Sequence, residues 1–556
     1  MRNTIHVKWI APLLVMGLVL TGCSGTGDLP DTTAAASIST SSSVETDEED
    51  SSDSTKSGTD STAEYAAVFE KDSVIDINIE VSDENWAAIL ADPMAEEYVS
   101  ADVTVDGTTV SDVGIRAKGN SSLMSVANSD SDRYSLRVKF DKYVDGQSLL
   151  GLDELVLNNC FSDPSYMREY LTYEAFSELG SDTPLTVYAN IYINGELFGF
   201  YLCVEDVGDS FLAREFDNDD GNLYKAGQGS TLSADSAIDS FSLKTGDDES
   251  LSGIQELVDI LDAMPAGEKG DIESILDVDS VLKYFAVNTV LGSYDSYLGG
   301  FSQNYYLYES DGVSTMIPWD YNMSFGGFSS DNGTSTTIPI DEPVQGVTLA
   351  SRPLAAKLLA VDEYLQKYHD YIETVTAYLS QMESRTAALA DIIRPYVAAD
   401  PNAFYTITEF EDAIILHDDT EEAASDTTVP ITTSDEAAQT TTSDASVPSS
   451  SGDSTMPEPP SGTDGVIGTG PAPGDVPGDG SGFSPDGNTD GFPAGGPGGN
   501  AGGGQGGFGG QSLNMIPVSI LDYAADRLLN ITQQLAGELP TTGNTTVTNT
   551  DTMPVK

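Results

Sequence analysis

Alternation between apolar and polar residues, with the two-residue period of a β-strand, dominates the chain between residues 74 and 206. It runs through residues 74–81, 103–118, 133–140 and 187–204. In the third of these segments, the alternation places Arg137 and Lys139 on one face. In the last segment, Asn194-Gly195 separates two apolar runs and predicts a tight hairpin. This part of the chain is therefore expected to be rich in strands.

Beyond residue 206 the apolar residues recur mainly with the 3.6-residue period of an α-helix. Helices are predicted at about 253–263, 272–291 and 354–397, the last with a break near Val361-Asp362. An earlier helix is predicted to begin at Asp163-Pro164 and to end at Gly180, since Asp favours the N-cap and Pro the first helical position. A last amphipathic helix near 519–536 carries the apolar stripe Ile520, Leu521, Ala524, Leu528 and Ile531. A helix with such a stripe is expected to pack against the folded chain.

A second predicted hairpin carries polar residues that suit phosphoryl transfer. Residues 305–308 and 313–317 are β-prone runs separated by Glu-Ser-Asp-Gly, which is a turn sequence. Asp295 precedes the hairpin, Asn304 begins it and Asp320 follows it, so strand pairing brings the three groups toward one edge. Protein kinases use the same set: one Asp orients the attacking hydroxyl, and an Asn and a second Asp hold Mg²⁺. By spacing alone, the pattern also fits an ordinary hairpin with two capping acids.

The residues Gly-Asn-Ser-Ser at 119–122 predict a turn whose backbone N–H groups can cradle a phosphate. Arg116 stands before this turn, and Arg137 and Lys139 stand on the following strand, so basic residues gather beside it. The same four residues form ordinary turns in most proteins. On the next helix, Glu169 either pairs with the strand lysine, as a helical Glu does in kinases, or complements the helix dipole near its N-terminus.

The charge balance narrows the class of protein. The 556 residues include 23 Lys and Arg against 90 Asp and Glu, which gives a formal net charge of −67. Nucleic acids and anionic membranes require a basic surface, so neither is expected as the main binding partner. With three Cys, the chain is not a disulfide scaffold. Cys160 and Cys203 stand in apolar surroundings, either as core thiols or as a disulfide pair.

The N-terminal segment, residues 1–23, looks like a bacterial lipoprotein signal. A basic start precedes an apolar run at 9–20, which is too short to span a membrane comfortably. The run ends in Leu-Thr-Gly-Cys, so Cys23 is expected to become the lipidated N-terminus after cleavage. The lipid would hold the protein on the extracytoplasmic face of the cell membrane. An ordinary secretory peptide with a chance Cys is the alternative.

Two long stretches contain few large apolar residues. Residues 24–65 are mainly Ser, Thr, Asp and Glu, and residues 417–513 are Thr, Ser, Asp and Pro followed by Gly. Such segments cannot bury enough apolar surface to offset the loss of chain entropy on folding. We therefore expect a disordered N-terminal tether, a long disordered insert before the last helix at 514–538, and a disordered tail at 539–556.

Six motifs in a fixed order make the chain resemble the CotH family, kinase-like proteins named after a spore-coat component. The motifs are Gly114–Ser122, Tyr134–Asp141, Leu157–Asn159, Asp163–Glu169, Tyr192–Tyr201 and Pro318–Gly326. The resemblance implies an α+β fold with a bilobal, atypical protein-kinase-like domain at 66–416. Its N-lobe would span about 66–206 and its C-lobe about 207–416, and the last helix would return to the same domain.

The resemblance also implies an activity and assigns roles to residues. The chain would be an atypical extracytoplasmic kinase that uses ATP with Mg²⁺ or Mn²⁺ and phosphorylates Ser or Thr of cell-surface or spore-coat proteins. Asp295 would orient the acceptor hydroxyl, while Asp320 and Asn304 would hold the metal ion. The expected nucleotide contacts are Arg116, Asn120, Ser121, Arg137, Lys139, Glu169 and, through its backbone at the inter-lobe position, Glu205.

The motifs of ordinary kinases do not accompany these residues. No Gly-x-Gly-x-x-Gly loop follows a predicted strand, and neither His-Arg-Asp nor Asp-Phe-Gly occurs. The kinase assignment therefore depends on the family resemblance, and ATP is scarce outside the membrane. The alternative is a protein that keeps the fold without turnover, such as a surface, coat-assembly or adhesion protein.

Overall fold

The computed structural model describes residues 63–328, 334–417 and 518–543. The predicted signal peptide with Cys23, nearly all of the predicted tether, residues 418–513 of the predicted insert and most of the predicted tail lie outside these ranges. Within the described residues, no helix combines the length and the apolar character needed to cross a membrane.

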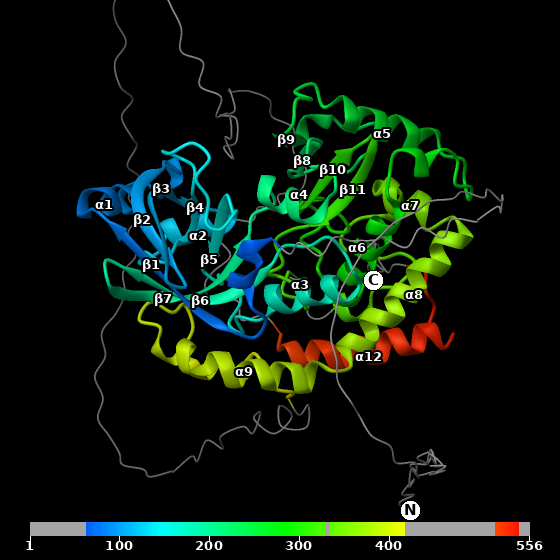
Figure 1. Cartoon of the computed structure of the whole chain (residues 1–556). Helices are drawn as coiled ribbons and strands as arrows, with labels where there is room; N and C mark the ends of the chain where they lie inside the picture. Colours follow the sequence, from blue (N-terminus) through cyan, green and yellow to red (C-terminus); the bar gives the residue numbers. More distant parts are fainter. Residues whose placement is uncertain (1–62, 329–333, 418–517, 544–556) are drawn as a thin grey trace, which may run out of the picture. The chain divides into compact units, whose positions relative to one another are not determined.

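Seven strands of the described chain form a closed barrel in the order β1-β2-β3-β4-β5-β7-β6 (Figure 1). They are β1 (Val74–Val81), β2 (Val99–Val105), β3 (Thr108–Lys118), β4 (Ser135–Lys139), β5 (Glu154–Asn158), β6 (Thr186–Ile193) and β7 (Glu196–Glu205). The parallel pairing of β1 with β6 closes the barrel, and the other neighbouring strands pair antiparallel. Because successive side chains of a strand point to opposite faces, the apolar residues on one face of these strands gather in a continuous buried cluster. The strand-rich part predicted before residue 206 is this barrel.

The predicted Asn194-Gly195 turn is confirmed by its backbone geometry, and a second turn of the barrel shares that geometry. Asp106 and Gly107 join β2 to β3 with φ of 43° and 83°, and Asn194 and Gly195 join β6 to β7 with φ of 52° and 82°. Positive φ at both central residues is the type I′ turn, whose twist matches that of the paired strands. Gly is favoured at the second position because this conformation crowds any Cβ atom.

A second sheet has four strands in the order β11-β10-β8-β9. They are β8 (Asn222–Ala226), β9 (Phe241–Thr245), β10 (Tyr305–Ser310) and β11 (Val313–Pro318). The predicted hairpin is therefore confirmed as β10 and β11, which pair antiparallel from Tyr305 with Pro318 to Ser310 with Val313. This register brings the residues just before β10 beside those just after β11.

Helices occupy much of the chain beyond the barrel (Figure 1). The helices of the described residues are α1 (Asp83–Ala91), α2 (Ser121–Ala127), α3 (Arg168–Glu178), α4 (Asp209–Glu215), α5 (Ser252–Ala263), α6 (Val278–Val290), α7 (Pro353–Leu358), α8 (Asp362–Leu379), α9 (Met382–Ala399), α10 (Ile407–Asp412) and α12 (Ile520–Leu535). The predicted break near Val361-Asp362 is confirmed between α7 and α8, and a further break separates α8 from α9. The segment predicted as one helix at 272–291 is instead a short 3₁₀ turn followed by α6. The fold is thus of the α+β class.

The predicted start of α3 is wrong. The helix begins at Arg168, with Met167 as its N-cap, rather than at Asp163-Pro164. Asp163 still acts as a cap from outside the helix, because its two carboxylate oxygens accept hydrogen bonds from the Ser165 and Arg168 backbone N–H groups, each at 3.0 Å. The predicted end is confirmed, since Gly180 follows the helix with a φ of 61°.

The last helix, α12, packs against α8 and α9 and is anchored by a buried arginine (Figure 1). The Arg527 guanidinium donates to the backbone carbonyls of Thr289 at 2.9 Å, Ile338 at 2.8 Å and Thr336 at 3.1 Å. Tyr523 donates to the Val290 carbonyl at 3.1 Å. Because Thr289 and Val290 end α6, the last helix supports the segment that leads from α6 toward Asp295.

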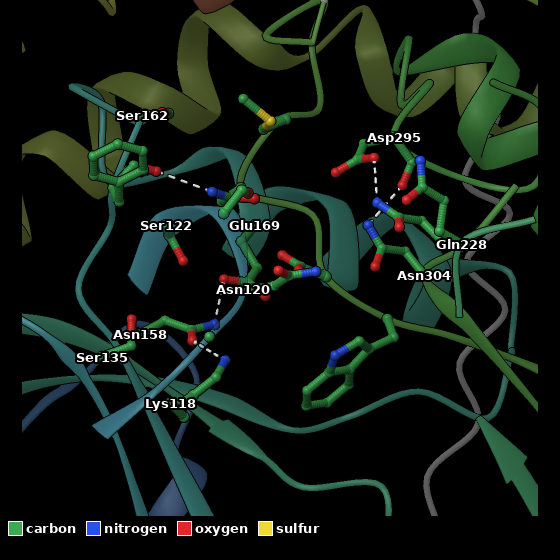
Figure 2. Close-up of a pocket in the computed structure, with 18 of the residues that line it drawn as sticks. Lys118, Asn120, Ser122, Ser135, Asn158, Ser162, Glu169, Gln228, Asp295 and Asn304 are labelled. Carbon is green, nitrogen blue, oxygen red and sulfur yellow. Dashed lines mark hydrogen bonds between the residues drawn. The ribbon is translucent and has the colours of Figure 1, made fainter. Parts of the chain in front are cut away.

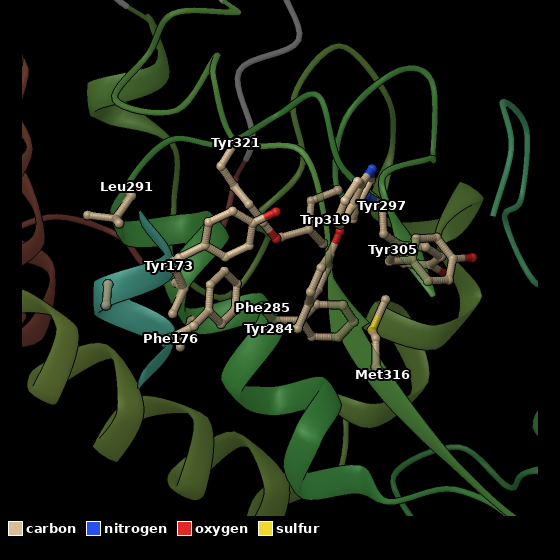
Figure 3. Packing of buried hydrophobic residues seen from close by; sticks show 14 of the residues in the cluster. Tyr173, Phe176, Tyr284, Phe285, Leu291, Tyr297, Tyr305, Met316, Trp319 and Tyr321 are labelled. Carbon is tan, nitrogen blue, oxygen red and sulfur yellow. The ribbon is translucent and has the colours of Figure 1, made fainter. Parts of the chain in front are cut away.

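A second apolar cluster contains many aromatic side chains and includes residues of the second sheet, α3 and α6. Figure 3 shows Tyr173 and Phe176 of α3 packed around Tyr321, with ring-centroid distances of 5.5 Å and 5.2 Å. This packing fixes the backbone directly after Asp320. Cys160 and Cys203 are both buried and free, so the structure selects core thiols over a disulfide between them.

Candidate functional site

A cavity of about 500 Å³ lies where the barrel meets the second sheet and α3. Seven of the residues predicted for the site line it, and Figure 2 shows four of them, Asn120, Glu169, Asp295 and Asn304. The seven are Asn120, Ser121, Arg137, Glu169, Asp295, Asn304 and Asp320. Three other predicted residues, Arg116, Lys139 and Glu205, are not among the lining residues.

Asp295 lies in the loop after α6 and is held by two amide side chains. Gln303 Nε2 donates to Asp295 Oδ1 at 2.7 Å, and Asn304 Nδ2 donates to the Asp295 backbone carbonyl at 2.7 Å. Burial, together with the nearby negative charge of Asp320, raises the pKa of the Asp295 carboxyl to about 7. The carboxyl is thus both fixed in position and able to exchange a proton near neutral pH.

Asp320 and Asn304 stand at the two ends of the β10–β11 hairpin. Both have left-handed backbones, with φ of 63° at Asp320 and 61° at Asn304. This conformation is uncommon for residues other than Gly, although Asp and Asn tolerate it better than most. The Asp320 backbone N–H donates to the Tyr173 hydroxyl at 3.1 Å, so the buried aromatic cluster positions the exposed carboxylate.

These donors suit a metal ion that arrives with a ligand of its own. Among the described residues, no group of three or more His, Cys, Asp or Glu side chains is placed to hold a metal. Mg²⁺ usually binds proteins through one or two carboxylates and completes its octahedron with water and substrate phosphates. The Asp320 carboxylate and the Asn304 amide oxygen fit a Mg²⁺ site of this kind. The Asn304 amide nitrogen is bound to the Asp295 carbonyl, so its amide oxygen is the atom that would face the metal ion.

Lys118, at the end of β3, is a cavity residue that the sequence analysis did not select. Its ammonium donates to Asn158 Oδ1 at 3.0 Å, and Asn158 Nδ2 donates to Glu169 Oε2 at 2.8 Å (Figure 2). Burial lowers the pKa of the Lys118 ammonium. Burial and the charge of Asp320 raise the pKa of the Glu169 carboxyl to about 7. One signal pointed to Lys118: it stands directly before the Gly-Asn-Ser-Ser turn and, by alternation, shares the face of Arg116.

Of the two alternatives for Glu169, the pairing with the strand lysine Lys139 is not formed. The Lys139 ammonium instead binds Glu154 at 2.9 Å and Asp141 at 3.4 Å. The register of the barrel explains the difference, because Lys139 of β4 lies directly opposite Glu154 of β5. Lys139 is therefore paired within the barrel and lies outside the cavity lining.

The two predicted arginines are committed to ion pairs. Arg137 lines the cavity, but its guanidinium binds Glu154 and Asp206, the latter at 3.0 Å. Arg116 lies outside the lining, forms an ion pair with Glu96 and stacks on the Tyr98 ring. Their charges are therefore largely balanced by neighbouring carboxylates.

Glu205 is a buried structural residue in this arrangement. Its carboxylate accepts from the Tyr65 hydroxyl at 2.5 Å, the Leu185 backbone N–H at 3.0 Å and Arg214 Nη2 at 2.6 Å. Its backbone N–H donates to the Leu185 carbonyl at 2.9 Å, so that N–H is occupied as well. Tyr65, which the sequence analysis placed in the tether, is buried and part of this cluster.

The predicted small-residue turn is the start of a short helix. Gly119 has a φ of 130°, and Asn120 is the N-cap residue of α2. Residues 119–122 all line the cavity on the side of Lys118. Of the basic residues expected beside the turn, only Arg137 shares the cavity lining with it, and Lys118, which was not predicted, lines it as well.

Comparison with known proteins gives the family. The model of the CotH kinase protein family matches residues 115–428, which is more than half of the chain. Inner spore coat protein H of Bacillus subtilis (strain 168) is 28% identical over 277 residues, covering 47% of this chain and 73% of that protein. The chain also aligns with a solved Shewanella oneidensis MR-1 complex of HipA, HipB and operator DNA, at 10% identity and a TM-score of 0.18, over 50% of this chain and 61% of that one. That last similarity is too low to inform fold or function. On the family match, the chain belongs to the CotH family.

Proposed function

We propose that this protein is an atypical kinase that transfers a phosphoryl group from ATP to Ser or Thr residues of surface or coat-type proteins. The observation that carries the proposal is the meeting of Lys118, Asp295, Asn304 and Asp320 around one cavity. A cation, two metal-binding oxygens and a positioned carboxyl are the parts that phosphoryl transfer requires. In this proposal the barrel corresponds to one lobe of a bilobal kinase-like domain and the helix-rich remainder to the other.

Each of the four residues has a distinct role in the proposed reaction. Asp320 and Asn304 would hold Mg²⁺ or Mn²⁺, which neutralises charge on the nucleotide phosphates when it is bound. Lys118 would donate to a phosphate oxygen, since Asn158 uses only one of its three N–H donors. Gln303 occupies Oδ1 of Asp295, which leaves Oδ2 to accept the proton of the acceptor hydroxyl.

The cellular location is proposed from the N-terminal sequence that precedes the folded domain. Cys23 ends an apolar run in a lipoprotein-like box, so the protein would be tethered by lipid to the extracytoplasmic face of the cell membrane. The name of the Bacillus subtilis relative, inner spore coat protein H, is consistent with a substrate on a surface or a coat.

Calorimetric titration of the full chain with ATP, with Mg²⁺ and with EDTA, tests the proposal. We expect Mg²⁺-dependent binding that Asp320→Ala abolishes, because a metal held by so few protein ligands cannot lose its carboxylate. Lys118→Ala should weaken binding by about 1.5–3 kcal/mol, the range for a hydrogen bond to a charged group. Lys139→Ala is the matched control and should change binding little, since Lys139 lies outside the cavity. Absence of ATP binding with every divalent ion would favour a non-catalytic surface or coat protein.

A further inference from the structure

Lys118 and Glu169 are joined by a neutral side chain instead of a direct ion pair. Asn158 accepts from the Lys118 ammonium at 3.0 Å and donates to the Glu169 carboxylate at 2.8 Å. Within the described chain, Lys118 and Glu169 form no salt bridge with each other. In ordinary protein kinases the strand lysine and the helical glutamate pair directly. The amide of Asn158 takes up the space between the two charges.

The barrel register creates this bridge. Lys118 of β3 pairs with Ser135 of β4, and the pairing of Leu136 with Leu157 places Asn158 of β5 next to Ser135. The three residues thus form a row across neighbouring strands, with the smallest side chain in the middle. Ser135 is itself held, because its hydroxyl accepts from the Asn159 backbone N–H at 3.1 Å. A small central residue lets the long Lys118 side chain cross the row and reach Asn158.

Without the amide, the two charges would attract each other. Glu169 is 4% exposed and Lys118 is partly buried, so water would screen that attraction less than at an exposed site. A direct ion pair would turn the ammonium toward α3 and balance its charge. An amide that binds both groups leaves two N–H donors of Lys118 for other partners.

We infer that Asn158 is a positioning residue, which keeps the Lys118 ammonium out of a direct ion pair with Glu169 and directed at an anionic oxygen of the ligand. The identity of that oxygen as a nucleotide phosphate rests on the proposed function. The inference itself rests on the two hydrogen bonds and on the strand register.

Binding of ATP and of adenosine to the full chain tests this role. We expect Asn158→Ala to weaken ATP binding about tenfold or more, in proportion to one lost charged hydrogen bond, and to leave adenosine binding unchanged. The double variant Asn158→Ala/Glu169→Gln should regain most of the lost ATP affinity, because the neutral amide that replaces the carboxylate cannot capture the ammonium. Asn402→Ala is the control for losing one amide hydrogen bond, since Asn402 Nδ2 binds the Phe198 carbonyl away from the cavity.

A merely structural role for Asn158 predicts other results. It would weaken ATP and adenosine binding alike, and the second substitution would not restore either; ATP affinity unchanged by Asn158→Ala would also overturn the inference. If Asn158→Ala does not fold, Asn158→Asp takes its place, because its carboxylate would balance the ammonium and selectively weaken ATP binding. If the wild-type protein binds no ATP, the proposed function fails, and a crystal structure of Asn158→Ala decides the positioning role. Contact of Lys118 with Glu169 in that structure would support it, and an unmoved Lys118 would refute it.

Discussion

His417 Nδ1 lies 2.6 Å from Asp522 Oδ2, so the residue that ends the second described segment is bound to the last helix. The other ring nitrogen of His417 lies 3.1 Å from Asp412 of α10. Carboxylates only accept hydrogen bonds, so an imidazole that donates to two of them must carry a proton on both nitrogens. These two hydrogen bonds raise the pKa of His417. The contact joins α10 to α12 most strongly when the imidazole is charged.

We expect α12 to be held more firmly at pH 5.5 than at pH 8.5. The folded pKa of His417 is raised above its unfolded value of about 6.5, so the stabilisation is complete below that value and is lost as pH rises through the folded pKa. The site is exposed, so the effect should be small, about 0.5 kcal/mol. Hydrogen exchange of α12 amides measures the effect as protection factors, which compare the observed exchange rate with the intrinsic rate at the same pH. His417→Gln should remove the difference in protection between pH 5.5 and pH 8.5, and equal protection factors at the two pH values in the wild type would contradict the prediction.

Substitution of Arg527 should weaken the attachment of α12 severely. Arg527→Met leaves three buried carbonyls without their donor, at a cost of about 3 kcal/mol in the free energy of unfolding. Leu529→Ala on the same helix is the control, because Leu529 is 60% exposed and should cost less than about 0.5 kcal/mol. Urea denaturation of both variants measures the difference, and equal losses would disprove the anchoring role of Arg527.

The hairpin with Asn304 and Asp320 could be predicted from the sequence because its determinants are local. The two alternating runs, the Asp-Gly turn and the short stretch of chain between the runs determine the pairing of β10 with β11, without any contribution from distant residues. The apolar stripe of α12 is local information of the same kind. Ile520, Ala524 and Ile531 are buried as expected, and Leu521 and Leu528 are partly buried.

The choice of cavity lysine could not be made in the same way. Alternation shows which face Lys118 and Lys139 occupy, but only the barrel register shows that Lys139 meets Glu154 and that Lys118 reaches Asn158. The surroundings of Glu205, which lies outside the cavity lining, could not be predicted for a related reason. Its partners Tyr65 and Arg214 come from segments far apart in the sequence, and no local pattern connects them.

Removal of Cys23 should release the protein from membranes. If the thiol carries the lipid, Cys23→Ala will alter N-terminal processing and move the protein to the soluble fraction, because buried acyl chains supply the anchoring free energy. The acidic sequence that follows cannot replace the lipid, since an anionic bilayer repels it. Fractionation with labelled fatty acid measures both effects. Membrane attachment that survives the substitution would point to a different anchor.

Asp295→Asn should abolish phosphoryl transfer, leave ATP binding largely intact and stabilise the metal-free protein above neutral pH. The folded pKa of Asp295, about 7, lies above its unfolded value, so the free energy of unfolding of the wild type falls as pH rises from about 4 to 7. At about 1.4 kcal/mol per pKa unit, the loss is at most about 4 kcal/mol. Asn cannot ionise, so the gain in melting temperature should be larger at pH 8 than at pH 5.

A surface acid provides the control for this pH dependence. Asp391 is 83% exposed in its ion pair with Arg394, so Asp391→Asn should change the melting temperature little at either pH. Bound Mg²⁺ should shrink the gain for Asp295→Asn, because a nearby cation favours the ionised carboxyl of the wild type. A gain that is the same at pH 5 and pH 8 would mean that the Asp295 carboxyl is already ionised at pH 5. In that case the loss of activity in Asp295→Asn would have to come from geometry alone, and Asp295 could not serve as a proton acceptor tuned to neutral pH.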